Sequence, residues 1–314
     1  MKSLAMLTRR EFWEHRNTFV ALPALVVAAL FAVMLLGTAY TPPSVNFSVQ
    51  SNIDSNGFSV PSNIPSGGNQ QQYEYQSDLT GTWATLLVTE LQATDNETRA
   101  KYLAVGLRTI ERILSVILYL VTLSFLLNCL LTDRRDRSIL FWKSMPVSDQ
   151  ATVLMKLFTA VIAVPLVYFA GIAALQVSWL FLLSLSTAGT ELSAWETVWA
   201  PAQLLSHWLD YLALVLINIL WCLPLWGWLL VVSAYAKSVQ LIWALGGPIA
   251  LVFVERLVSD QDHMKAWIMQ HCMPITSSAN ISDQLLSINM LSALITGAAM
   301  VGLAILLRGR ADEL

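Results

Sequence analysis

The four histidines are the residues whose spacing would most readily indicate catalysis, because imidazole serves as a zinc ligand and as a general base. They are His15, His207, His263 and His271, and no two form the His-x-x-x-His pair of a membrane metalloprotease. His263 and His271 share the segment 257–287 with Asp260 and Asp262, at a helical separation. A surface histidine in a polar segment is commoner than a weak metal site, so we expect neither a metal site nor catalytic residues.

Motifs for nucleotide hydrolysis and acyl transfer are also missing from the sequence. A phosphate-binding loop needs glycines before Lys-Ser or Lys-Thr, so that backbone amides and the lysine surround the phosphates. Lys-Ser begins at Lys2, Lys143 and Lys237, and none of these lysines follows a glycine. No Gly-x-Ser-x-Gly elbow for a serine nucleophile occurs either. We therefore expect no cofactor in this chain, and an ATP-driven process would need a separate subunit that binds ATP and Mg²⁺.

The composition indicates an integral membrane protein. Hydrophobic residues make up 56% of the 314 residues and charged residues only 12%, where soluble proteins carry about 25%. Twelve Trp fit the aromatic belts of a bilayer interface. The net charge of −3 excludes a nucleic-acid partner, which would require a basic surface. Three Cys without paired spacing indicate neither a disulfide framework nor a thiolate metal site.

Six stretches are long and apolar enough to cross the hydrocarbon core, which takes about 20 residues of helix. They cover about 18–36, 113–131, 157–185, 211–236, 238–256 and 290–307. Backbone polar groups in lipid must be bonded within the segment, so each stretch is expected to be a helix. Pro23, Pro165, Pro224 and Pro248 lie inside spans, and each carbonyl that they free needs a partner from a neighbouring helix or water. The predicted fold is an all-α integral membrane protein with six transmembrane helices.

The distribution of positive charge predicts how these spans are oriented. Six spans place both termini on one side, and twelve Lys and Arg fall on that side against six on the other. Short cytoplasmic loops carry the excess of Lys and Arg. Both termini are therefore predicted to be cytoplasmic.

Two segments outside the spans are expected at the membrane surface or beyond it. Residues 1–16 are moderately amphipathic and predict an interfacial helix on the inner leaflet. The first outer loop, 40–110, begins with a polar tract of low charge and has a helical pattern from Leu79 onward, with a helix from about Asn96 that leads into the second span. This loop is either a translocated linker, or a lid or docking surface for a periplasmic partner.

Five charged residues at the predicted outer ends of spans are candidates for a functional site, because ionisable groups near the bilayer are costly to place there. Arg108, Glu111 and Arg112 lie at the outer end of the second span, where Glu111 has the spacing to pair with either arginine. Glu255 and Arg256 close the fifth span. We interpret all five either as snorkelling side chains paired at the interface or as an outer gate around a transport path.

The loop between the second and third spans, 132–150, carries the most distinctive pattern. Alternating charges at 133–137 precede the apolar run Ile139–Trp142. Pro146 then breaks the chain, and Ser148-Asp149 can cap the helix that follows. A charged collar around a short apolar helix suits insertion into a groove on a cytoplasmic partner, and an ordinary positive-inside loop is the alternative.

With this loop, an amphipathic N-terminal helix and six spans, the chain resembles the ABC type-2 export permeases, the membrane subunits of bacterial ATP-driven exporters. The resemblance covers nearly the whole length, and its most specific part is DRRDRSILFWKSMPVSD at 133–149. It implies a coupling helix at 138–145 that touches an ABC ATP-binding subunit, and re-entrant helices at 257–287. Carried over, the partner-binding residues are Asp133, Arg134, Arg135, Arg137, Ile139, Phe141, Trp142 and Lys143.

The resemblance also implies a location and an assembly. The location is the bacterial cytoplasmic (inner) membrane, and a second permease copy would complete a dimer. The expected function is export of a lipid, a peptide or a drug-like substrate, driven by ATP hydrolysis in the partner subunit.

Two other functions are alternatives to an exporter. A repeat between the two halves or a buried carboxylate pair at mid-span would indicate a secondary transporter driven by an ion gradient. The sequence has neither in convincing form. A membrane-embedded transferase would have to use Asp54, Glu74 or Asp78, in an outer loop that is low in charge. An exporter permease is therefore the favoured hypothesis, with the secondary transporter as its alternative.

Overall fold

The computed structural model describes Trp13 and residues 15–39, 95–135, 148–187, 193–237, 239–259, 262–276 and 281–310. Within these ranges every regular element is a helix, and six helices are long and apolar enough to cross a membrane. The prediction of an all-α, multi-pass membrane protein is therefore confirmed. Most of the predicted interfacial helix at 1–16 lies outside the described residues, as do residues 40–94 of the outer loop and the coupling helix at 138–145.

The helices follow the predicted spans in order. The first span is α2 (Leu22–Ala39), entered through the π-helical turn η1 (Asn17–Ala21), and the second is α4 (Asn96–Arg135). The third consists of α6 (Asp149–Phe158), η2 (Thr159–Ala163) and α7 (Val164–Ser186). Then come η3 (Trp195–Trp199), α8 (Ala200–Ala202), α9 (Leu204–Trp221) and α10 (Leu223–Tyr235). The last are α11 (Gln240–Ser259), α12 (His263–Cys272), α13 (Ile281–Leu285) and α14 (Ile288–Arg310).

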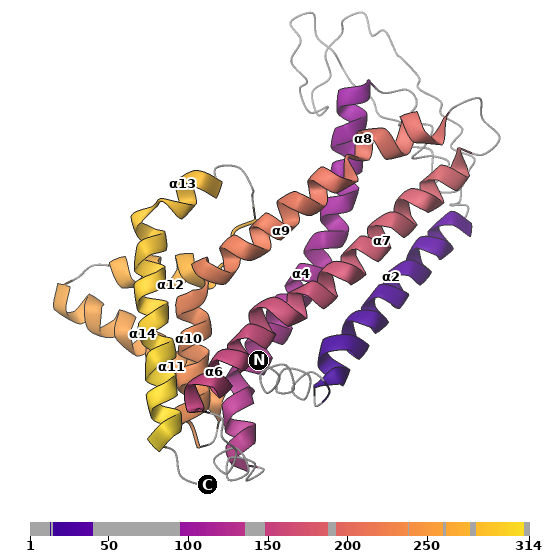
Figure 1. Ribbon diagram of the computed structural model, residues 1–314. Helices are drawn as coiled ribbons and strands as arrows, with labels where there is room; N and C mark the ends of the chain where they lie inside the picture. The colour runs from indigo at the N-terminus through magenta and orange to yellow at the C-terminus, as the bar shows by residue number, and fades with distance from the viewer. Residues whose placement is uncertain are drawn as a thin grey trace, which may run out of the picture.

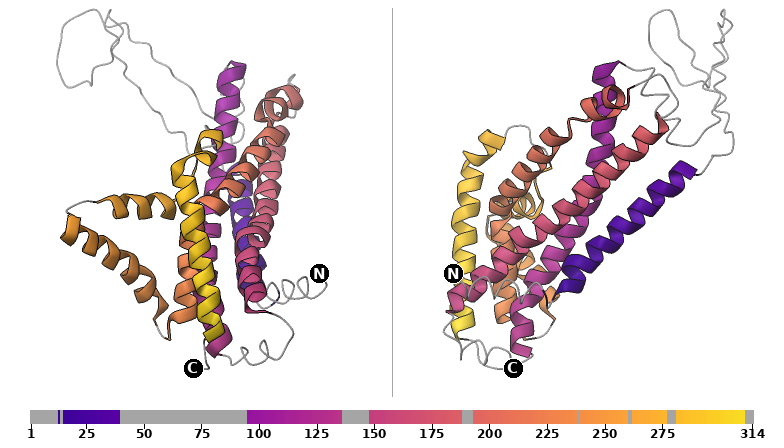
Figure 2. Two further views of the ribbon diagram at one scale, coloured as in Figure 1. Left: turned by 60° about the vertical axis from the view of Figure 1, so that its left-hand side comes forward. Right: turned by 45° about the vertical axis from the view of Figure 1, so that its right-hand side comes forward.

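The long helices form an elongated bundle from which α11 and α12 stand out to one side (Figure 1, Figure 2). Helix α4 runs through its middle and packs against α7 and α10, while α10 packs most extensively against α14. Helix α2 lies along α7 at the edge. At one end of the bundle α4 ends, α6 begins and α14 ends (Figure 1). We name this the loop end, because it flanks residues 136–147.

The fourth span differs from the predicted 211–236 in that it begins earlier and is broken. Helix α9 begins at Leu204, after Gln203, which has a left-handed φ of 44°. It ends at Trp221, and the chain restarts at Leu223 as α10. Pro224 has no N–H to donate to the carbonyl four residues earlier, so the helical ladder is interrupted there. The fourth span is therefore a bent pair of helices, which a count of apolar residues does not reveal.

The proline in α11 shows how a freed carbonyl is satisfied by a neighbouring helix. Pro248 cannot donate to the carbonyl of Ala244, its usual helical acceptor. The indole N–H of Trp228 in α10 donates to that carbonyl at 2.9 Å. Gly247 makes room for the indole, since a Cβ at this position would overlap the Trp228 ring. The expectation that a neighbouring helix would supply the partner holds at this proline.

Two glycines bring α10 and α14 into close contact. A Cβ on Gly227 would lie 2.7 Å from the Cβ of Met300 and 3.0 Å from the carbonyl oxygen of Gly297. A Cβ on Gly297 would lie 2.8 Å from the backbone of Leu223. Helices in membranes associate through such small residues, because lipid tails provide no hydrophobic drive between them. The α10–α14 pair is accordingly the tightest helix pair of the bundle.

The segment predicted as re-entrant turns back toward the bundle after α11. Ala244 is the only buried residue of α11. The exposed side chains of this helix are mostly apolar, which suits contact with lipid. Helix α12 then returns, and its C-terminal end reaches α9 and α4. The Trp221 indole donates to the Gln270 carbonyl at 3.0 Å, and the Tyr119 hydroxyl donates to the Cys272 carbonyl.

Candidate functional site

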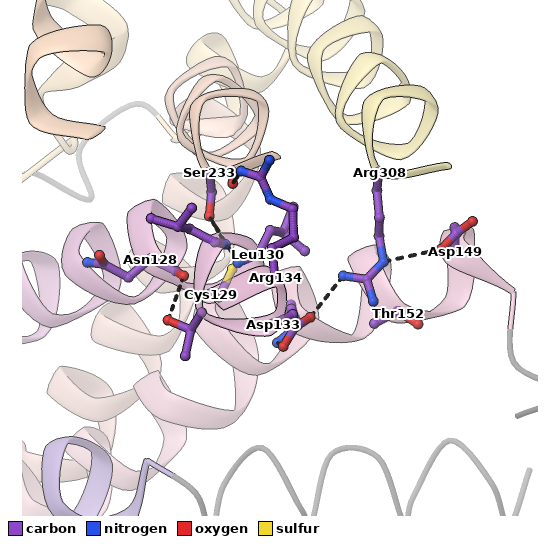
Figure 3. A network of polar contacts seen from close by, with 12 residues as sticks. Asn128, Cys129, Leu130, Asp133, Arg134, Asp149, Thr152, Ser233 and Arg308 are labelled. Atoms are coloured by element: carbon purple, nitrogen blue, oxygen red, sulfur yellow. Dashed lines mark hydrogen bonds and ion pairs between the residues drawn. The ribbon is translucent and has the colours of Figure 1, made fainter. Parts of the chain in front are cut away.

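A cluster of four charged side chains, three of them buried, joins three helices at the loop end (Figure 3). Asp133 of α4 lies 3.2 Å from the ammonium of Lys156 in α6 and 2.9 Å from a guanidinium nitrogen of Arg308 in α14. Arg308 also lies 3.3 Å from a carboxylate oxygen of Asp149 in α6. The side chains of Lys156 and Arg308 are only 2% and 3% exposed. Two carboxylates thus offset two cations, and we name these four residues the Asp133 cluster.

Arg134, the next residue of α4, ties this end to α10 instead. Its guanidinium donates to the backbone carbonyls of Ser233 and Ala236, at 3.1 and 2.6 Å. The Ser233 hydroxyl accepts from the backbone N–H groups of Leu130 and Leu131 in return, at 2.9 and 3.3 Å. The carbonyls at the end of a helix have no partner within it, so a cation placed there stabilises the helix. The end of α4 is therefore fixed to α6, α10 and α14.

The structure separates the predicted partner-binding residues into three groups. Asp133 and Arg134 are buried in contacts within the chain, at 8% and 6% exposure. Arg135 is exposed. The other five, Arg137, Ile139, Phe141, Trp142 and Lys143, lie outside the described residues, and their role stays a prediction.

The start of α6 agrees with the capping pattern of the sequence. Ser148 is the N-cap, and its hydroxyl accepts from the backbone N–H of Ala151 at 3.2 Å.

Lys156 and Arg308 are not among the predicted site residues. Each is a cation close to the end of an apolar span, and this position is the signal in the sequence that could have marked them as site residues. That both contact Asp133 follows only from the packing of the helices.

A cavity of about 370 Å³ lies between α4, α9 and the start of α10. Its charged end is lined by Arg108, Glu111, Arg112, His207 and Asp210. Its other end is lined mainly by apolar side chains, including Leu118, Val161, Ile219 and Trp226. From Arg108 to Thr122, the α4 wall is about 21 Å long at the helical rise per residue. The cavity is thus polar at one end and apolar at the other.

Three of the five outer gate candidates meet in this cavity, and two do not. Arg108, Glu111 and Arg112 line it together. Glu111 lies 2.9 Å from the His207 ring of α9, and within the described part of the chain it forms no ion pair with Arg108 or Arg112. Glu255 and Arg256 lie on α11, where the Glu255 carboxylate accepts from the Met264 N–H at 2.9 and 3.1 Å. This carboxylate joins α11 to α12.

Residues 274–276 form one wall of the cavity, held by Asn218. The Asn218 amide donates to the Ile275 carbonyl at 2.9 Å and accepts from the Ile275 N–H at 2.7 Å. Asn218 thus bonds to the non-helical segment that follows α12. Gln176 of α7 bonds between helices, since it donates to the Leu107 carbonyl of α4 and accepts from the Trp208 indole of α9.

His271, expected on a polar surface, is buried between two tryptophans. Its ring stacks on Trp221 and lies beside Trp267, with centroid distances of 4.9 and 4.5 Å. Its two ring nitrogens lie 2.8 Å from the Trp267 carbonyl and 3.3 Å from the Asn289 carbonyl. Among the described residues, no three His, Cys, Asp or Glu side chains gather as they would around a metal ion.

Comparisons with known proteins leave the function to be argued from this geometry. Neither the protein-family models, nor the curated proteins, nor the solved structures include a match to the chain. The Asp133 cluster and the cavity are therefore the two features that can support a function.

Proposed function

We propose that the chain is the non-catalytic permease subunit of an ATP-driven ABC exporter. It would lie in a bacterial inner membrane with both termini in the cytoplasm. The observation that carries the proposal is the anchoring of residues 136–147 at both ends. The chain enters this segment directly after Asp133 and Arg134 and leaves it at Asp149. A loop that transmits force from a partner needs such fixed ends.

The contacts at the loop end offer a route for that force. A displacement of 136–147 would act on α4 and α6, which flank it in the chain. The Asp133–Arg308 ion pair would pass it to α14, and the Arg134 hydrogen bonds would pass it to α10. Packed helices move as rigid bodies between discrete arrangements rather than by gradual deformation. ATP binding in the partner subunits would thus shift a group of spans together.

The test is whether an ATP-binding subunit remains bound to the chain. The full chain is purified from its native host in mild detergent, and the bound proteins are identified and quantified by mass spectrometry. We expect a stoichiometric ABC ATP-binding subunit, which Trp142→Ala removes. Trp195→Ala is the matched control, because Trp195 is an exposed tryptophan on η3 that is remote in sequence from 136–147.

The alternative is a secondary transporter driven by an ion gradient, and one observation favours it. The cavity contains Glu111 in contact with His207, and Asp210 beside them, which are groups that can carry protons. Purification of a clean homo-oligomer without an ATP-binding subunit, together with uptake or efflux that follows a proton gradient, would replace the exporter with this alternative.

A further inference from the structure

The charged end of the cavity contains two arginines, Arg108 and Arg112, and two carboxylates, Glu111 and Asp210. Arg108 and Arg112 are one turn apart on α4, so both side chains project from the same face of the helix. Neither has an ion pair with another described residue, because the nearest carboxylate in sequence, Glu111, is in contact with His207. Both arginines are exposed, so an anion can reach their guanidinium groups. This end of the cavity can therefore accept an anionic group.

The other end of the cavity favours hydrocarbon. Leu118, Val161 and Ile219 supply aliphatic surface, and Tyr119 and Trp226 supply aromatic surface. Small-molecule sites are typically 300–1,000 Å³ in volume, apolar in most of their lining and fixed in orientation by a few polar groups. At about 370 Å³, this cavity is in that range. Its arrangement, with charge at one end and apolar side chains at the other over about 21 Å of helix, matches the shape of an amphiphile.

We infer that the cavity binds an amphiphile with an anionic, phosphate-type headgroup. The headgroup lies between Arg108 and Arg112, and the hydrocarbon lies between Leu118 and Trp226. Planar guanidinium groups bind phosphate oxygens in pairs, which gives both orientation and strength. Asp210, which has no ion pair among the described residues, faces the same charged end and disfavours a second anion there. The inference rests on the proposed function only in that such an amphiphile would then be the exported substrate.

The binding experiment uses the full chain in lipid nanodiscs without any ATP-binding subunit. The probe is lysophosphatidic acid, and the comparison compound is the monoacylglycerol with the same acyl chain, which lacks only the phosphate. Binding is measured by native mass spectrometry over a concentration series. We expect the phosphate compound to bind at least tenfold more tightly. Equal affinity for the two compounds would overturn the inference, because the arginines would then contribute nothing.

Variants then locate the site. Arg108→Gln with Arg112→Gln should lower the affinity for lysophosphatidic acid at least tenfold and leave the affinity for the monoacylglycerol within about twofold. Lys101→Gln is the control, since Lys101 is an exposed cation on the same helix that pairs with Glu97 at 2.7 Å. An equal loss with Lys101→Gln would indicate general attraction by the surface and would overturn the site.

A second variant separates the amphiphile from free phosphate. Leu118→Trp should fill the apolar end and weaken lysophosphatidic acid while leaving inorganic phosphate unaffected, and the elution volume on gel filtration checks that it folds. If inorganic phosphate binds as tightly as the amphiphile, the hydrocarbon part of the inference is wrong. Because no ATP-binding subunit is present, the amphiphile can bind even if the exporter proposal is wrong. Equally, the exporter proposal can be right even if the amphiphile does not bind.

Discussion

Replacing Asp133 with Asn is expected to destabilise the fold more than any other conservative change of a charged residue in the described helices. Asn keeps the size of the side chain but removes the charge that Lys156 and Arg308 share, at 3.2 and 2.9 Å. Removing one partner of a buried ion pair costs about 3–5 kcal/mol, because a charge is left without compensation in a poorly solvated site. Arg308 keeps Asp149, so we expect the lower end, about 3 kcal/mol.

A double variant tests whether the cost arises from uncompensated charge. In Asp133→Asn with Lys156→Met, the ammonium that lost its carboxylate is absent, so part of the stability should return. We expect a coupling of about 1–2 kcal/mol between the two positions. Glu97→Gln is the surface control: Glu97 and Lys101 are 77% and 68% exposed, and such pairs contribute at most about 0.5 kcal/mol.

The measurement is reversible unfolding by sodium dodecyl sulfate in mixed micelles, followed by far-ultraviolet circular dichroism. It yields a free energy of unfolding for each variant under one condition. If Asp133→Asn costs no more than Glu97→Gln, the cluster contributes little to stability. If the two single changes simply add, Asp133 and Lys156 do not interact energetically, and the argument for a fixed loop end fails with them.

Two further predictions concern helix packing and use the same unfolding assay. Gly297→Leu should cost about 1–3 kcal/mol or more of unfolding free energy by overpacking the α10–α14 contact. Gly302→Ala is the control and should be neutral or slightly stabilising, because nothing lies within 4 Å of the added Cβ. Equal effects of the two changes would contradict the close contact. Trp228→Phe should cost about 1 kcal/mol by removing the donor to the carbonyl that Pro248 frees. The cost should shrink when Pro248→Ala restores an N–H to that helix, and a cost unchanged by Pro248→Ala would refute the account.

Local features of the fold follow from the sequence because they depend on neighbours in the chain. Apolar stretches of about 20 residues predict the spans, and the helical pattern near Asn96 correctly predicts where α4 begins. Ser148 is the expected N-cap of α6 because the capping interaction involves only the next three residues. The break at Cys222 was not predicted, since Pro224 alone does not say whether a helix bends or restarts.

The candidate sites follow from the sequence only in part because they depend on which spans are neighbours. Arg108, Glu111 and Arg112 are neighbouring candidates in the sequence, either as paired interface residues or as part of an outer gate, and they line one cavity. The partner of Glu111 is His207, which is 96 residues away and could not be chosen over two nearby arginines by spacing alone. Asp133 is a candidate for partner contact by sequence, and only the packing of α6 beside α4 and α14 brings Lys156 and Arg308 to it.

The two sites are connected because α4 contributes to both. Asp133 lies near one end of this helix and Arg108 is 25 residues before it, which is about 37 Å along the axis. A straight helix transmits a tilt over its length, so a tilt of about 5° pivoting at the Asp133 cluster would move Arg108 by about 3 Å. That shift is comparable to the 2.9 Å between Glu111 and His207 on the opposite wall. A small tilt of α4 about the loop end is therefore enough to change the contacts at the charged end of the cavity, without any change inside the helix itself.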